Sequence, residues 1–156
     1  MKTIDKILLD SITLQAKETT RLRKNFNFHT SYSEPINRML NAMEPGTYIQ
    51  PHKHESPDKF EIFLALRGRF AVFTFDDAGN ILHYCILDPK QGIYGVEIPE
   101  RTYHTLISLE TGSVAYEIKA GPYTPLTAKD FAPWAPAEGN PEVENFMQSL
   151  LNKIDL

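Results

Sequence analysis

The sequence predicts a mainly β fold, a jelly-roll β-barrel with short helices before it and one helix after it. From residue 36 to residue 120, short apolar segments alternate with Gly, Pro, Asp and Asn. Segments that recur at intervals of about eight to ten residues are typical of sandwiches and barrels rather than of βαβ units. We therefore expect one domain over residues 1–156, with a helical segment at 1–35, the barrel at 36–120, and a wrapping segment and closing helix at 121–156.

Two short helices are expected near the N-terminus, because apolar residues recur there at roughly helical spacing in two groups. The groups are Ile4, Ile7 and Leu8, then Ile12, Leu14 and Ala16. Asp10, Ser11 and Thr13 are residue types that cap helices, so they are possible caps here.

Six segments rich in aromatic and β-branched residues predict strands. They are FEIFLAL (60–66), RFAVFTF (69–75), ILHYCIL (81–87), GVEI (95–98), YHTLIS (103–108) and SVAYEIK (113–119). Gly68 permits a tight connection between the first two, and DDAGN (76–80) has the composition of a hairpin turn. The segments are therefore expected to form an antiparallel β domain.

The C-terminal part contains proline-dense segments, which cannot be central strands because proline lacks the backbone donor. We expect them to wrap the barrel, with Phe131 and Trp134 packing on it. A closing helix is expected after Pro141, where four apolar residues are spaced three or four apart. They are Val143, Phe146, Met147 and Leu150.

Composition excludes several classes of function. The net charge is −4, so no broad basic surface is expected for nucleic acid, and the one basic cluster, residues 21–24, is expected on a solvated helix face or in an N-terminal contact. No apolar run approaches the roughly 20 residues of a membrane span. The single cysteine, Cys85, cannot form an internal disulfide and is expected to be buried and unreactive, which together with the absence of a signal-like N-terminus predicts a cytoplasmic protein.

Four residues could form a metal site. His52 and His54 are one residue apart, and alternate residues of a strand share a face, so their imidazoles could converge on one ion. Glu61 lies on an expected strand with apolar residues on both faces, where a carboxylate needs a compensating charge, and His104 has apolar neighbours too. Taken singly, each residue also fits a plainer interpretation: histidines in a polar loop or a hydrogen-bonded core, and a glutamate paired with Lys59 or an arginine.

The pattern Gly-x5-His-x-His-x6-Glu-x6-Gly, followed by Pro-x4-His, resembles the two signature motifs of the cupin superfamily. This resemblance implies a cupin-type jelly-roll β-barrel in which His52, His54, Glu61 and His104 bind one divalent transition metal ion per chain: Zn, Fe, Mn, Ni or Co. The gap before Glu61 is longer than usual, so Glu55 and Asp58 remain rival ligands. Glu61 is preferred because it keeps the spacing to the following glycine and lies within a strand.

Strings along nearly the whole chain, among them RLRKNFNFH, INRMLNAMEPGTYIQPHKH and KDFAPWAP, resemble the WbuC-type cupin-fold metalloproteins. This implies an association with bacterial surface-polysaccharide gene clusters, but it implies no particular reaction and no catalytic residue. We expect a metal-dependent enzyme for a small sugar-derived substrate, with isomerisation or epimerisation ahead of oxygenation. The alternative is a non-catalytic protein that uses the metal to bind a sugar or metabolite. His29 and His83 are expected outside the ligand set, and a homodimer paired through sheet edges is expected.

Overall fold

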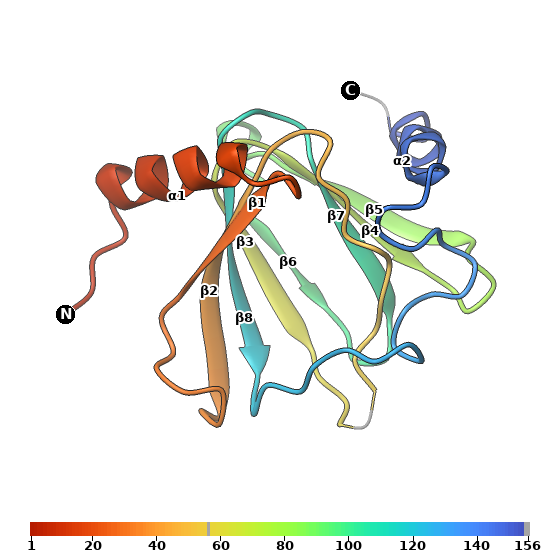
Figure 1. Ribbon diagram of the computed structural model, residues 1–156, viewed down its shortest axis with the longest axis horizontal. Helices are drawn as coiled ribbons and strands as arrows, with labels where there is room; N and C mark the ends of the chain where they lie inside the picture. The colour runs from red at the N-terminus through yellow and green to blue at the C-terminus, as the bar shows by residue number, and fades with distance from the viewer. Residues whose placement is uncertain (56, 155–156) are drawn as a thin grey trace.

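Two antiparallel sheets face each other and enclose the barrel in the computed structural model, which describes residues 1–55 and 57–154 (Figure 1). The larger sheet has the strand order β1-β2-β8-β3-β6, and the smaller has the order β5-β4-β7. The strands are β1 (Arg23–Asn27), β2 (Ile36–Met43), β3 (Glu61–Arg67), β4 (Phe70–Phe75), β5 (Ile81–Leu87), β6 (Gly95–Ile98), β7 (Tyr103–Ser108) and β8 (Ser113–Ala120). The helices are α1 (Lys6–Glu18), the short 3-10 helix η1 (Pro89–Gln91) and α2 (Val143–Leu151).

The mainly β jelly-roll prediction is confirmed, and all six predicted strands occur within about one residue of their expected ends. The alternation expected along β3 is present: Glu61, Phe63 and Ala65 are buried, whereas Ile62 and Leu64 are less so. The core between the sheets is a cluster of apolar side chains from both. Its buried members are Met43, Phe63, Ala65, Phe70, Val72, Leu87, Ile98, Leu106 and Ala115.

One continuous helix, α1, stands where two were expected. The polar side chains that suggested a break are satisfied within it. Asp10 pairs with Lys6 one turn earlier and with Arg67 of the barrel, and the Thr13 hydroxyl donates to the backbone carbonyl of Leu9. These residues therefore stabilise the middle of the helix and its attachment to the barrel.

The segment expected to be helical also contains a strand, β1, which pairs antiparallel with β2. The basic cluster at residues 21–24 therefore runs into a sheet edge instead of lying on a helix. Arg21 and Arg23 both pair with Glu138 of the C-terminal region. Hydrophobic periodicity missed β1 because four of its five residues are exposed, as is usual for a polar edge strand.

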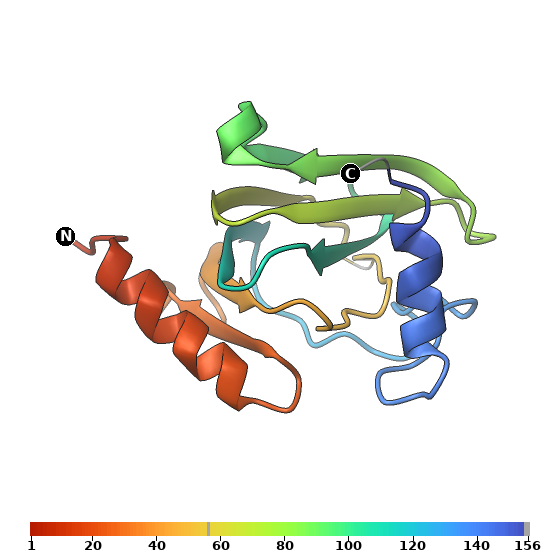
Figure 2. The same cartoon turned by 90° about the horizontal axis from the view of Figure 1, so that it is seen from above.

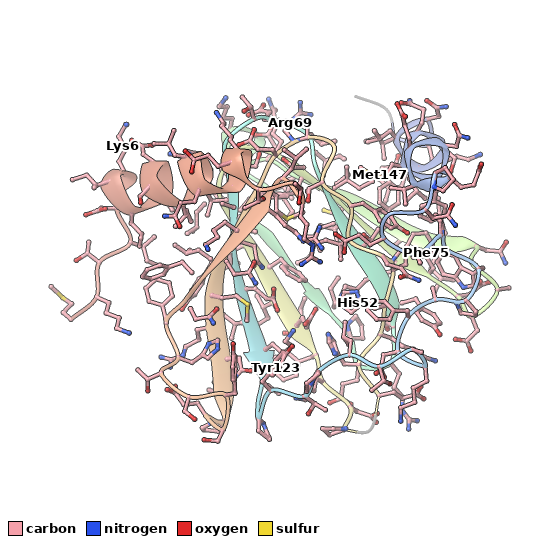
Figure 3. All side chains as sticks on the ribbon, viewed as in Figure 1. Lys6, His52, Arg69, Phe75, Tyr123 and Met147 are labelled. Atoms are coloured by element: carbon pink, nitrogen blue, oxygen red, sulfur yellow. The ribbon has the colours of Figure 1, made fainter. Side chains whose placement is uncertain are left out.

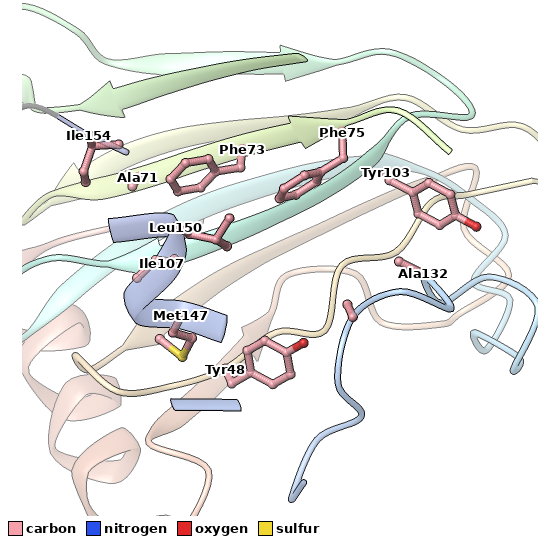
Figure 4. Close-up of a cluster of buried hydrophobic side chains, with 11 residues drawn as sticks. Tyr48, Ala71, Phe73, Phe75, Tyr103, Ile107, Ala132, Met147, Leu150 and Ile154 are labelled. Carbon is pink, nitrogen blue, oxygen red and sulfur yellow. The ribbon is translucent and has the colours of Figure 1, made fainter. Parts of the chain in front are cut away.

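The C-terminal region wraps the barrel as expected, and α2 closes it over the smaller sheet. Met147 and Leu150 of α2 join Phe73 and Phe75 of β4 in a second buried cluster (Figure 4). The ring of Trp134 lies 5.0 Å from that of Phe75, which confirms its predicted packing role. The helices α1 and α2 lie on opposite sides of the barrel (Figure 2), and no helix in the described part of the chain is long and apolar enough to span a membrane.

Gly68, between β3 and β4, should tolerate no side chain. It has φ +74, and a Cβ there would lie 2.1 Å from Ser113 Oγ and 2.8 Å from Ser113 Cα. We expect Gly68→Ala to lower the free energy of unfolding by about 2–4 kcal/mol, measured by urea denaturation, because overpacking adds to the backbone strain.

Gly112→Ala is the matched control for this prediction. Gly112 has φ +73, but a Cβ there would meet no described atom within 4 Å. Only the backbone strain remains, so a loss of about 1 kcal/mol is expected. Equal losses in the two variants would contradict a steric role for Ser113.

Candidate metal centre

The segment that carries His52 and His54 is held on both sides by backbone hydrogen bonds, although it lies outside the eight strands. On one side, His52 N donates to His104 O at 3.2 Å and His104 N donates to His52 O at 3.0 Å. On the other side, Lys53 N donates to Asp130 O at 2.9 Å. The segment therefore lies between β7 and the wrapping segment, residues 121–140 (Figure 3).

Side chains alternate along this short extended segment, as predicted. The Lys53 ammonium lies over the ring of Tyr103, 4.7 Å from its centroid, on the apolar side that faces α2. His52 and His54 lie on the other side, together with His104. The two histidines thus share a face because they are one residue apart in extended backbone.

The structure brings together all four residues that the sequence singled out. His52, His54, Glu61 and His104 each offer one ligand atom, and these atoms lie within 4.8 Å of one another. Ligand atoms on opposite sides of an ion with bonds of roughly 2.0–2.2 Å lie about 4 Å apart, so the spacing suits a metal. Glu61 and His104 are each only 2% exposed.

The contact between His104 and Glu61 needs a proton or a metal ion between the two facing atoms. His104 Nδ1 lies 2.9 Å from the carbonyl oxygen of Thr102, which can only accept, so Nδ1 carries a hydrogen. In the neutral ring, Nε2 then presents a lone pair to Glu61 Oε2, 2.8 Å away. Two lone pairs repel at this distance unless a proton or a metal ion lies between them.

His52 is oriented in the same way, with Nδ1 3.0 Å from the carbonyl oxygen of Gln50. Backbone acceptors on Nδ1 fix the tautomer and leave Nε2 for a metal, which is the common arrangement of metal-binding histidines. Burial is the main cause that lowers the pKa of His52 to about 3, and the neighbouring His104 acts in the same direction. The ring is therefore neutral, as a metal ligand must be.

Two buried atoms of the group lack hydrogen-bond partners among the described residues: His54 Nε2 and Glu61 Oε1. They lie 2.9 Å apart, and Lys119 Nζ lies 2.7 Å from Glu61 Oε1, but none of these contacts has hydrogen-bond geometry. An unsatisfied buried polar atom costs about 1–3 kcal/mol, and more when it is charged. An ion at the centre of the group would satisfy both atoms.

The ionisation of Glu61 also suits a ligand. Burial acts to raise its pKa, but Lys119, then His104 and His54, outweigh burial and hold the pKa well below the usual range. For His104, burial acts to lower the pKa, and the hydrogen bond with Glu61 outweighs it and raises the pKa. The carboxylate is thus ionised and attracts positive charge to the group.

The rival carboxylates lie outside this group. Asp58 accepts from Arg101 Nε at 3.0 Å, and Glu55 pairs with Lys53 at 3.3 Å. His29 is buried elsewhere, where the backbone N–H of Arg38 donates to its Nδ1 at 3.1 Å. His83 is exposed on β5, as expected.

Three polar residues that the sequence analysis did not select border the site. Lys119 pairs with Glu61 and, at 2.9 Å, with Glu117, and the Asn41 amide donates to Glu117 Oε2 at 2.6 Å. The pairing of β3 with β8 places Lys119 directly opposite Glu61. The sequence did contain a signal for these residues, because Glu117 and Lys119 alternate with apolar residues on a central strand. The same argument singled out Glu61.

A cavity of about 80 Å³ adjoins the ligand group. Its polar lining is His52, Glu61, His104, Thr105, Asn41, Glu117 and Lys119, and its apolar lining is Met43, Ile49, Phe63 and Leu106. Sites for drug-sized ligands span roughly 300–1,000 Å³, so this cavity suits a compact polar group instead of a whole large ligand.

Solved structures that share this fold include one that is named for a cupin domain. A cupin 2 domain-containing protein from Halorhodospira halophila matches with a TM-score of 0.52 and 13% identity over 86% of this chain and 83% of that one. KdgF from Halomonas sp. matches with a TM-score of 0.51 and 18% identity over 65% and 82%. CapF from Staphylococcus aureus, a capsular polysaccharide assembling protein, matches with a TM-score of 0.54 and 18% identity over 65% of this chain but only 27% of CapF.

At these identities the likeness concerns the fold, and the barrel is a cupin jelly roll. No curated protein matches the sequence significantly. One family model, described as a domain of unknown function (DUF6016), matches residues 4–87, which include His52, His54 and Glu61. Because this match covers more than half of the 156 residues, the chain belongs to the DUF6016 family.

Proposed function

We propose that His52, His54, Glu61 and His104 bind one divalent transition metal ion. The observations that carry this proposal are the contact of Glu61 Oε2 with His104 Nε2 at 2.8 Å, which needs a proton or a metal ion, and two further ligand atoms without a hydrogen-bond partner among the described residues. Three imidazole nitrogens and one carboxylate oxygen suit Fe(II), Mn(II), Co(II), Ni(II) or Zn(II).

We further propose that the metal-bound protein is an enzyme for a small sugar-derived substrate, with isomerisation or epimerisation ahead of oxygenation. A divalent ion would supply a Lewis acid for an oxygen-donor ligand. The adjoining cavity would admit a hydroxyl pair or a carboxylate of that ligand beside His52 and His104. The resemblance to WbuC-type cupins and the structural similarity to CapF, a capsular polysaccharide assembling protein, both favour a carbohydrate context.

The purified protein should carry about one transition metal ion per chain, because four convergent ligands and a buried carboxylate favour a single ion. Elemental analysis after dialysis against metal-free buffer measures the stoichiometry. A protein that stays metal-free after incubation with Fe, Mn, Co, Ni and Zn salts would rule out the proposed site.

Alanine at any of the four ligands should weaken metal affinity by about 100-fold or more, since even partners behind the ligands contribute 10- to 100-fold. Asp58→Ala and Glu55→Ala are the matched carboxylate controls, and His83→Ala is the histidine control. Each should change the affinity by less than about threefold, because the three side chains lie outside the ligand group and exposed ion pairs contribute little. Loss of metal in Asp58→Ala with retention in Glu61→Ala would reverse the carboxylate assignment.

An enzyme and a binding protein differ in turnover. Metal-loaded protein incubated with nucleotide sugars and sugar acids should form products that are absent with His104→Ala. NMR is required beside mass spectrometry, because isomerisation leaves the mass unchanged. Binding without product across this panel would favour the non-catalytic, metal-assisted binding protein.

A further inference from the structure

Lys119 is the one lysine that lines the cavity beside the ligand group, among the residues that the structure describes. Its side chain is 14% exposed, and its Nζ lies 2.7 Å from Glu61 Oε1 and 2.9 Å from Glu117 Oε1. An ammonium carries three N–H donors, so two neighbouring carboxylates leave at least one donor for a further acceptor. The cavity that Lys119 borders is where such an acceptor would lie.

The charges around the cavity do not cancel when an ion is bound. A divalent ion and Lys119 carry three positive charges, whereas Glu61 and Glu117 carry two negative charges, and the histidines are neutral as ligands. The net charge of the site is then +1. Asn41 donates to Glu117 and holds that carboxylate toward β2, which limits its repulsion of an anion.

We infer that the cavity binds a small monoanion, a hydroxy or sugar carboxylate, and that Lys119 Nζ donates a hydrogen bond to its carboxylate. This inference rests on the proposed metal site and specifies its substrate class. A carboxylate compensates the remaining positive charge, and it is compact enough for a cavity of about 80 Å³. Lys119 is thus a specificity-determining residue that favours acids over neutral sugars.

Glycolate and ethylene glycol form a matched pair of probes, because they share a two-carbon skeleton and differ in the carboxylate. Their binding to the metal-loaded full-length protein is measured by calorimetry after the metal content has been determined. Lys119→Met should retain the metal, bind glycolate about tenfold or more weakly, and bind ethylene glycol within about twofold of the unmodified protein. Lys90→Met, at an exposed lysine, should change neither.

The double variant Lys119→Met/Glu117→Gln separates the ammonium from the net charge. The double variant removes the Lys119 ammonium and the Glu117 carboxylate together. The divalent ion and Glu61 remain, so the net charge of the metal-bound site stays at +1. If glycolate binding stays weak in the double variant, the Lys119 donor is responsible. Glycolate binding that is restored there, or that is unchanged in both variants, would overturn the inference.

Failure of the proposed function has a different signature. Unmodified protein that takes up no metal would overturn the metal site and, with it, the carboxylate inference. Unmodified protein that takes up metal but binds glycolate no better than ethylene glycol would overturn the carboxylate inference alone.

Discussion

The structure depends on one buried charge, the carboxylate of Glu61 at the start of β3. It is 2% exposed, and an uncompensated carboxylate in such a place would cost several kcal/mol. Its neighbours come from three parts of the chain: His104 from β7, Lys119 from β8 and His54 from the segment before β3. The two sheets and the preceding segment therefore meet around this charge.

The wrapping segment is tied to the same centre. Its backbone pairs with Lys53 and, at Phe131, with His52, while Trp134 anchors it on Phe75 of the smaller sheet. The helix α2 packs on the outer face of β4 and β7, next to the wrapping segment. The part of the chain after residue 120 thus stabilises the extended conformation that turns both histidines inward, whereas the four residues of the ligand group all come from before it.

Departures from the usual cupin spacing are absorbed in exposed loops. Asp58, in the long gap before Glu61, accepts a hydrogen bond from Arg101, which lies in the turn before His104 and has φ +59. The ion pair joins the loops on either side of the site. Glu55 also lies 3.9 Å from Arg101. Both rival carboxylates therefore lie beside Arg101 and not in the ligand group.

Alternation and motif spacing are local properties of the chain, so the jelly-roll class, six strands, the closing helix and the four residues of the candidate centre could be predicted from the sequence. It did not reveal β1, whose pairing energy comes from β2 and whose side chains are mostly exposed. Nor did it reveal Lys119, Glu117 and Asn41 as neighbours of Glu61. Only the register of β2, β8 and β3 brings them together, and that register is decided by sheet pairing between residues far apart in the chain.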